Sequence, residues 1–248
     1  MTAAPTAVPI GLANRLLSAL SPAERARLEP YLEPVDLAFR QTLVKAEAPI
    51  GHVFFLHDAV ASAVTEFPDG EVVEVGLMGT EGCAGLALLF GNPACVTTTL
   101  VHVPGRASRM RAADFRREVV DRGGESFRLL LRYANAFNGM VAQIAACNAS
   151  HTVEQRFARW LLLVHDRVHR EHFPLTHEFA ALLLGVRRAG VTEAANRLRI
   201  AGAIDYRAGD MRIRDRAALQ QVACGCYGAV GRLLTDSLAP ARLVTTPS

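Results

Sequence analysis

The spacing of apolar residues divides the chain into predicted parts, the first of which is rich in strands. Between about residues 35 and 111, short apolar runs alternate with glycine, proline and an Asp-Gly turn. This pattern predicts strands over 52–57, 61–67, 71–76, 97–103 and 107–111, as in an antiparallel sandwich or roll. Two short helices are expected before it, within 11–32, because Ser21, Pro22 and Glu24 form a capping box.

A long helix is predicted over 123–148, after a helix at 114–121 and a Gly123-Gly124 break. Its apolar residues are spaced by three and four, which is the pattern of a parallel coiled coil with the same helix of a second copy. The predicted seam consists of Phe127, Leu130, Ala134, Phe137, Val141 and Ile144. The same stripe would also fit against the strand-rich part of its own chain.

A second domain is expected to follow a hinge at 148–151. Thr152 and Gln155 form a capping box for a helix whose inner face carries Phe157, Trp160, Leu161, Val164 and Val168. The predicted organisation is therefore a strand-rich domain at 11–122, a long helix at 123–148 and a second domain at 149–230, with a terminal helix over 217–230.

Residues 175–214 have the layout of a winged helix-turn-helix. Thr176 caps a helix over 177–184, Gly185 ends it, and a second helix runs from about 187 to 199. Two short strands, 203–206 and 211–214, then flank a turn and form the wing.

The second of these helices has an apolar and a polar face. Val191, Ala195 and Leu198 are expected to face the domain. The residue types on the other side suit base edges, and further residues suit phosphates. The predicted base contacts are Arg188, Thr192, Glu193 and Asn196, and the predicted phosphate contacts are Thr176, Arg187, Arg199 and Arg212. The competing interpretation is an amphipathic helix with a solvated charged face.

These residues resemble the Crp/Fnr family of bacterial transcription regulators. The resemblance is carried by Leu175-Thr176, Leu184-Gly185-Val186, Arg188, Val191-Thr192, Leu198, Gly202-Ala203-Ile204 and the end of the wing at Ile213–Asp215. It implies an α+β fold. In that fold an eight-stranded, cyclic-nucleotide-binding-like β-roll at 11–122 is the sensor domain, 123–148 is the dimerisation helix and 149–230 is a winged helix-turn-helix DNA-binding domain. It further implies a homodimer that binds double-stranded DNA, with RNA polymerase and a small-molecule effector as further partners.

The effector pocket of this chain departs from that of cyclic-nucleotide-binding relatives. Its candidate residues are Gly79, Glu81, Gly82, Gly85, Thr97 and Thr98. Where those relatives place an arginine for the cyclic phosphate, this chain has Ala94-Cys95-Val96-Thr97. A buried phosphate without a cation is costly, so we expect no binding of cyclic AMP or cyclic GMP.

Composition narrows the function classes. The formal net charge is only +3 over 248 residues, and Lys45 is the only lysine, so the chain is not a general polycation. Any affinity for nucleic acid has to come from one local group of residues. No signal peptide and no apolar run of about 20 residues is apparent, which predicts a cytoplasmic protein without membrane contact. No catalytic motif is present either, so we expect a regulator and not an enzyme.

The five cysteines raise a rival hypothesis, a redox- or metal-responsive sensor that uses Cys224 and Cys226. Two thiolates are fewer than the four ligands of a structural metal site, and Cys147 or a histidine would have to join them. We therefore expect buried, inert cysteines with no metal and no cofactor. His165, His169 and His172 are spaced by four and three and so would lie near one helix face. This spacing allows metal binding, but we interpret the three histidines as a polar helix face.

Overall fold

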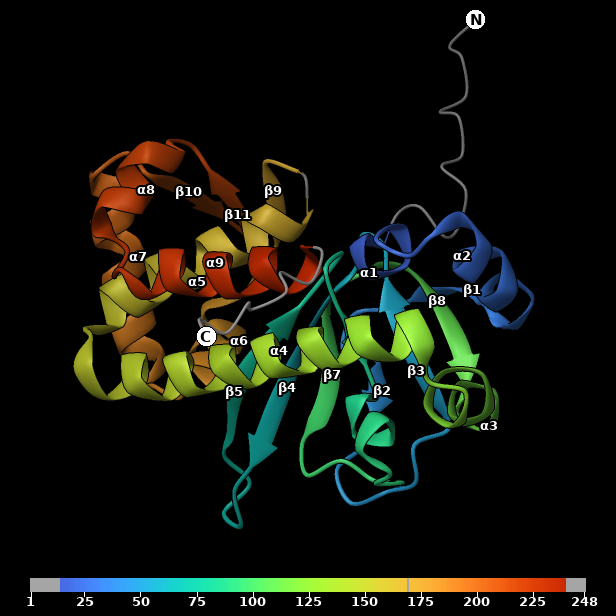
Figure 1. The fold of residues 1–248 in the computed structure, drawn as a ribbon. Coiled ribbons are helices and arrows are strands. Elements are labelled where there is room, and N and C mark those ends of the chain that lie inside the picture. Colours follow the sequence, from blue (N-terminus) through green and yellow to red (C-terminus); the bar gives the residue numbers. More distant parts are fainter. Residues whose placement is uncertain (1–13, 169, 240–248) are drawn as a thin grey trace, which may run out of the picture.

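The computed structural model describes residues 14–168 and 170–239, and its amino-terminal half is an antiparallel β-roll (Figure 1). One sheet has the strand order β1-β8-β3-β6 and the other β2-β7-β4-β5. These eight strands confirm the expected roll. They are β1 (Glu33–Leu37), β2 (Thr42–Val44), β3 (His52–Leu56), β4 (Val60–Glu66), β5 (Val72–Met78), β6 (Cys83–Ala84), β7 (Thr98–Val103) and β8 (Gly105–Arg111).

The two sheets enclose a core of small and branched side chains, among which Val53, Leu56 and Val101 are fully buried. The β4–β5 hairpin turns at the predicted Asp-Gly pair, where Gly70 has a φ of 83°. A short 3-10 helix, η3 (Leu86–Phe90), follows β6 and lies between two glycines in the left-handed region, Gly85 and Gly91.

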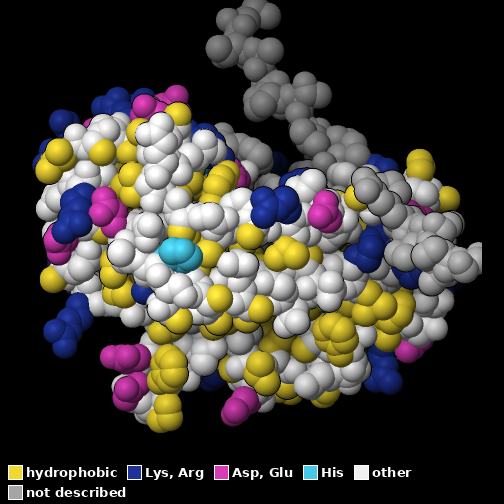
Figure 2. All heavy atoms as spheres, turned by 60° about the vertical axis from the view of Figure 1, so that its left-hand side comes forward, with side chains coloured by type: hydrophobic (Ala, Val, Ile, Leu, Met, Phe, Trp, Pro, Cys, Tyr) yellow, Lys and Arg dark blue, Asp and Glu magenta, His cyan; other side chains and the backbone are white. Residues whose placement is uncertain are grey.

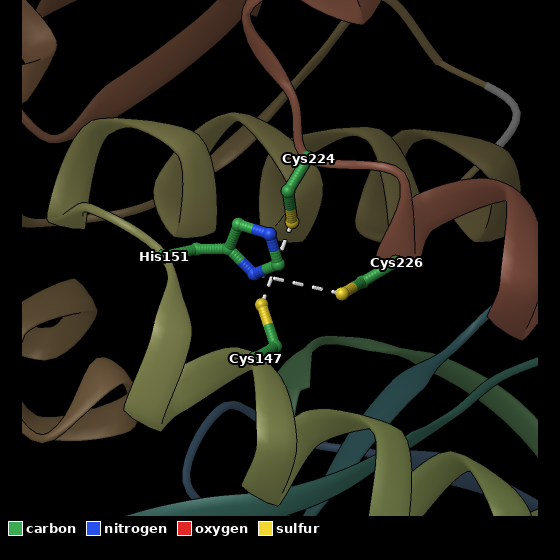
Figure 3. Close-up of side chains that lie close together, drawn as sticks. All are labelled: Cys147, His151, Cys224 and Cys226. Carbon is green, nitrogen blue, oxygen red and sulfur yellow. Dashed lines mark hydrogen bonds between the residues drawn. The ribbon is translucent and has the colours of Figure 1, made fainter.

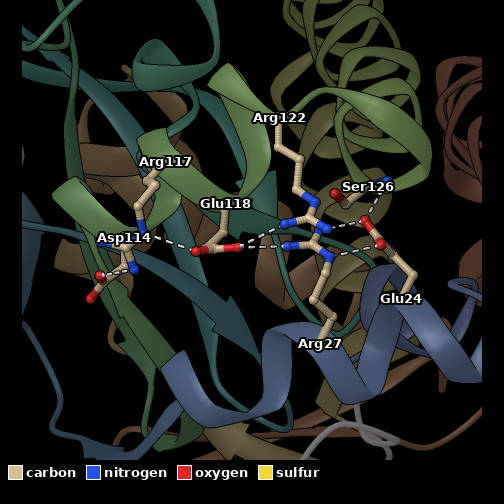
Figure 4. Close-up of polar contacts among 7 residues, drawn as sticks. All are labelled: Glu24, Arg27, Asp114, Arg117, Glu118, Arg122 and Ser126. Carbon is tan, nitrogen blue, oxygen red and sulfur yellow. Dashed lines mark hydrogen bonds and ion pairs between the residues drawn. The ribbon is translucent and has the colours of Figure 1, made fainter.

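Helices close one end of the roll. α1 (Arg15–Ser18) and α2 (Pro22–Leu28) precede the first strand, and the Ser21 hydroxyl caps α2 as predicted. The helix expected at 114–121 is divided into α3 (Ala112–Phe115) and a π-helical turn, η4 (Arg116–Asp121). Glu118 of η4 accepts from Arg27 of α2, which ties the helix before the roll to the helical turn after it (Figure 4).

The longest element, α4 (Gly124–Ser150), crosses the whole molecule in front of the roll (Figure 1). A carboxy-terminal helix, α9 (Cys226–Leu238), runs alongside it. Arg132 of α4 donates to the carbonyl oxygen of Ser237 at one end of this contact, and Gln143 donates to the sulfur of Cys226 at the other. The terminal helix predicted over 217–230 was wrong, because residues 223–225 separate α9 from a short helix, α8 (Arg216–Val222).

The second domain begins with α5 (Val153–Val168), and Thr152 and Gln155 form its predicted capping box. Its expected inner face is buried, with Trp160 only 1% exposed. α6 (His177–Leu184) and α7 (Arg188–Ile200) pack on it, followed by the wing strands β10 (Ile204–Arg207) and β11 (Asp210–Ile213). A third strand, β9 (His172–Pro174), joins β11, so the predicted placement of His172 on a helix was wrong; His169 lies outside the described residues.

Between residues 14 and 239, position 169 aside, no helix is long and apolar enough to cross a membrane.

Candidate nucleic-acid interface and neighbouring sites

The turn between α6 and α7 has the geometry of a helix-turn-helix. The Thr176 hydroxyl accepts from the backbone N–H of Phe179 at 3.1 Å and caps α6. Gly185 ends α6 with a φ of 60°, the left-handed conformation that a residue with a side chain avoids. α7 then buries Val191, Ala195 and Leu198 as expected.

One row of side chains on α7 is open to solvent. Arg188, Asn196 and Arg199 are exposed, and with Thr192 they follow one another at spacings of four, four and three along the helix. Arg187, directly before α7, is exposed as well. The guanidinium groups of Arg187, Arg188 and Arg199 form no ion pair with any residue that the structure describes. The guanidinium donors of this row are therefore free for a ligand.

Other predicted contact residues are already engaged within the chain. The Thr192 hydroxyl donates to the Arg188 carbonyl oxygen and contacts Nδ1 of His177 at 3.1 Å. Glu193 pairs with Arg197 at 2.6 Å, and Arg212 of the wing pairs with Glu171 at 2.7 Å. These pairs are exposed, so a phosphate can compete with them at little cost.

The predicted effector residues do not form one pocket. Glu81 is buried and pairs with Arg167 of α5 at 2.6 Å, so its carboxylate links the two domains instead of lining a cavity. Gly79 and Gly82 pack directly against side chains of Arg167 and Tyr133. Thr98 accepts from the backbone N–H of Ala46, and Gly85 caps η3.

An open groove of about 650 Å³ lies instead between the roll and α4. Thr97 lines it, together with Phe90 and Val96 from the roll and Asn135 and Asn138 from α4. No lining residue is charged. Figure 2 shows hydrophobic side chains gathered over the lower part of the molecule, where the roll lies.

The predicted dimer seam was wrong for Leu130, Ala134 and Ile144, which are buried within a single chain. Phe137 also packs inward, because its ring lies where a Cβ on Gly76 of β5 would be, 2.5 Å away. Phe127 and Val141 remain half-buried. The stripe is thus largely buried within its own chain, and Phe137 contacts the roll, as in the alternative interpretation of the pattern.

A group of three cysteines and one histidine lies where α4 ends. Cys147 and His151 come from the last turn and the cap of α4, Cys224 comes from the segment between α8 and α9, and Cys226 is the first residue of α9 (Figure 3). Burial raises the pKa of the Cys147 thiol to about 12, and nearby Arg159 acts in the opposite direction. The sequence indicated that Cys147 or a histidine would have to join Cys224 and Cys226. The spacing of four between Cys147 and His151, which places both on one side of a helix end, was the signal for which histidine it is.

Comparison with known proteins identifies the second domain. Residues 155–222 match the Crp-like helix-turn-helix domain. No curated protein matches the chain by sequence.

Solved structures match most of the chain. The structure of FixK2 from Bradyrhizobium japonicum is 14% identical and aligns over 78% of this chain and 98% of that chain, with a TM-score of 0.66. TTHB099, a CRP family transcriptional regulator from Thermus thermophilus, is 19% identical over 76% and 96%, with a TM-score of 0.62. CLP, the c-di-GMP responsive global regulator of Xanthomonas campestris, is 13% identical over 78% and 99%, with a TM-score of 0.63.

Proposed function

We propose that this chain, which belongs to the Crp/Fnr family of DNA-binding transcription regulators, acts as a homodimer that reads a two-fold symmetric DNA site. The observation that carries the proposal is the exposed row on α7, where Arg188, Asn196 and Arg199 have no competing partner among the described residues. Arginine and asparagine are the side chains that pair best with guanine and adenine edges in the major groove.

The roles within this row follow from position. Arg188 stands at the first position of α7 and Asn196 two turns later, so both suit base edges, as does the partly engaged Thr192. Glu193 stays a candidate for a base contact if its pair with Arg197 opens. Arg187, Arg199, Arg212 and the capped start of α6 at Thr176 suit phosphates, because helix amino termini and guanidinium groups both attract anions.

The proposed dimer uses a face of α4 that the single chain leaves open. Its residues are spaced by four and three, and they are Leu131, Asn135, Asn138, Ala142, Ala145 and Ala149. Small side chains at this spacing let two helices approach closely. Two copies of α7 related by a two-fold axis would then meet half-sites about 34–36 Å apart.

We propose in addition that the groove beside α4 does not take a cyclic nucleotide. Its lining carries amide and hydroxyl groups but no cation, which suits a neutral or a cationic effector better than a phosphate. A constitutive regulator without an effector is compatible with the same lining.

The DNA proposal is tested by selection from random duplexes followed by binding measurements on variants. We expect an enriched palindrome at physiological salt. Replacing Arg188→Ala should weaken binding by about 1–3 kcal/mol at one base position and relax the preference there. Replacing Arg199→Ala should weaken all sequences alike and reduce the salt dependence, since it removes a phosphate contact.

Arg116→Ala is the matched control, because Arg116 is an exposed arginine of the sensor domain, with 77% of its side chain accessible. Its affinity for DNA should equal that of the unmodified chain. The proposal fails if no sequence is enriched, or if Arg188→Ala binds the selected site unchanged.

A further inference from the structure

We propose that Cys147, His151, Cys224 and Cys226 form a tetrahedral site for one zinc ion. The four ligand atoms all lie within 4.8 Å of one another, and no two of the ligands are adjacent in sequence. Three thiolates and one imidazole are an established ligand set of structural zinc sites. The inference does not depend on DNA binding.

The separations between ligand atoms fit a single ion. The Cys147 and Cys224 sulfurs are 3.4 Å apart, and the Cys226 sulfur is 3.7 Å from Nδ1 of His151. A zinc–sulfur bond of about 2.3 Å places the sulfurs of a tetrahedral site about 3.8 Å apart. In Figure 3 the four side chains point toward one another from two separate segments, with the His151 ring among the three sulfurs.

The surroundings supply the charge that such a site needs. Zinc with three thiolates and a neutral imidazole carries a net charge of −1. Arg159 is only 2% exposed, and its Nε and Nη1 atoms have no hydrogen-bond partner among the described residues. Arg156, one turn earlier, also has an Nε without a partner there. A buried guanidinium without an acceptor is costly, and an anionic zinc–thiolate centre beside it removes that cost.

A hydrogen bond from Gln143 supports one of the ligands directly. Nε2 of Gln143 donates to the sulfur of Cys226 at 3.1 Å. Donors of this kind stabilise a metal-bound thiolate and orient it toward the ion. The zinc ion would displace the protons of three thiols, so binding releases up to three protons to solvent.

Other uses of the four residues fit the geometry less well. A sulfur–sulfur separation of 3.4 Å is far longer than the bond of about 2.05 Å in a disulfide. An iron–sulfur cluster needs a wider cage, because several iron and sulfide atoms lie between its thiolates. Borderline-soft zinc is the divalent ion that this mixture of sulfur and nitrogen favours.

The position of the site gives it a structural role. Cys147 and His151 lie at the hinge between α4 and α5, whereas Cys224 follows α8 and Cys226 begins α9. One ion would therefore fasten the end of α8 and the start of α9 to the end of α4. This clip holds the DNA-binding domain at one orientation to the long helix.

The test measures metal directly. Protein purified under anaerobic conditions should contain one zinc ion per chain by elemental analysis. The metal-free chain, titrated with Co²⁺, should develop the visible bands of a tetrahedral cobalt–thiolate centre. The single variants Cys226→Ser and His151→Ala should bind zinc at least about 100-fold more weakly, since even outer-shell changes cost 10–100-fold.

Cys95→Ser is the matched control, because Cys95 is partly exposed in the roll and lies outside the cluster. It should keep one zinc ion and the same cobalt spectrum. The proposal is overturned by a chain that retains no zinc and gives no cobalt–thiolate bands. An iron–sulfur absorption spectrum, or a Cys147–Cys224 disulfide in the purified protein, overturns it equally.

Discussion

A buried polar network couples individual side chains of the roll to α5. The Ser62 hydroxyl donates to Glu74 at 2.6 Å and contacts Nδ1 of His102 at 2.9 Å. The Trp160 indole N–H of α5 donates to the same carboxylate. Burial lowers the pKa of His102 to about 3, and Arg167 acts in the same direction. Burial also raises the pKa of Glu74, although Ser62 and Trp160 partly offset it.

These shifts predict an acid sensitivity that belongs to His102. An unfolded histidine takes up its proton near pH 6.5, whereas the folded one resists until about pH 3. Stability is therefore fully present above pH 6.5 and is lost as the pH falls below it, by about 1 kcal/mol at pH 5.5. Glu74 acts in the opposite sense, because its raised pKa favours the folded state on acidification.

The substitution His102→Asn isolates the histidine, since it keeps a polar group beside Ser62 and leaves Glu74 in place. We expect the loss of unfolding free energy between pH 7.5 and 5.5 to be about 1 kcal/mol smaller in this variant than in the unmodified chain. Urea unfolding at the two pH values measures it. Equal losses in both proteins would show that His102 does not resist protonation.

At the scale of elements, α4 has three different faces. One is buried within the chain at Leu130, Ala134 and Ile144 and contacts Gly76 of β5 through Phe137. A second contacts α9, where a Cβ on Gly139 would lie 3.2 Å from Leu233. The third is open and carries Ala142 and Ala145 near its centre. We place the proposed dimer interface on this third face.

A charge at the centre of that face should separate the subunits. We expect Ala142→Arg to be a monomer at micromolar concentration, because the two-fold axis would bring two arginines together in an apolar contact. Light scattering coupled to size exclusion measures the mass. Ala217→Arg is the control, since Ala217 is an alanine of a different helix, α8. A dimer that survives Ala142→Arg would assign the interface to another surface.

At the scale of the whole molecule, the winged domain is docked on the β-roll. The buried Glu81–Arg167 pair joins the loop after β5 to α5. The α6–α7 turn lies against the β4–β5 hairpin, where a Cβ on Gly185 would meet Val73 at 2.8 Å. Phe39 of the roll stacks edge-on against Phe179 of α6, with ring centres 5.5 Å apart. These contacts connect the roll physically to the helix-turn-helix.

The Glu81–Arg167 pair also bears on the effector prediction. Glu81 was a predicted effector residue, and its carboxylate is held by Arg167. We expect calorimetric titration of the purified protein with cyclic AMP or cyclic GMP to give no binding at micromolar concentration, because the groove offers no cation and Glu81 is paired with Arg167. Micromolar binding that Thr97→Ala weakens would contradict this, since Thr97 is a polar residue of the groove.

Local signals in the sequence were enough to predict most of the helices and strands. The caps at Ser21, Thr152 and Thr176 and the turn at Gly185 depend on hydrogen bonds and backbone angles within a few residues, so the sequence alone predicts them. The same holds for the inward stripe of α7. The winged helix-turn-helix was therefore recognisable without coordinates.

Only the tertiary structure decided how these elements use their side chains. The 3–4 spacing of Phe127 to Ile144 fits a partner helix and the chain's own roll equally well, and packing on β5 selects the roll. Glu81 finds Arg167 across 86 positions, and Cys147 meets Cys224 across 77. Such contacts depend on how distant segments fold together, which periodicity and composition do not encode, because both describe only a residue's neighbours along the chain.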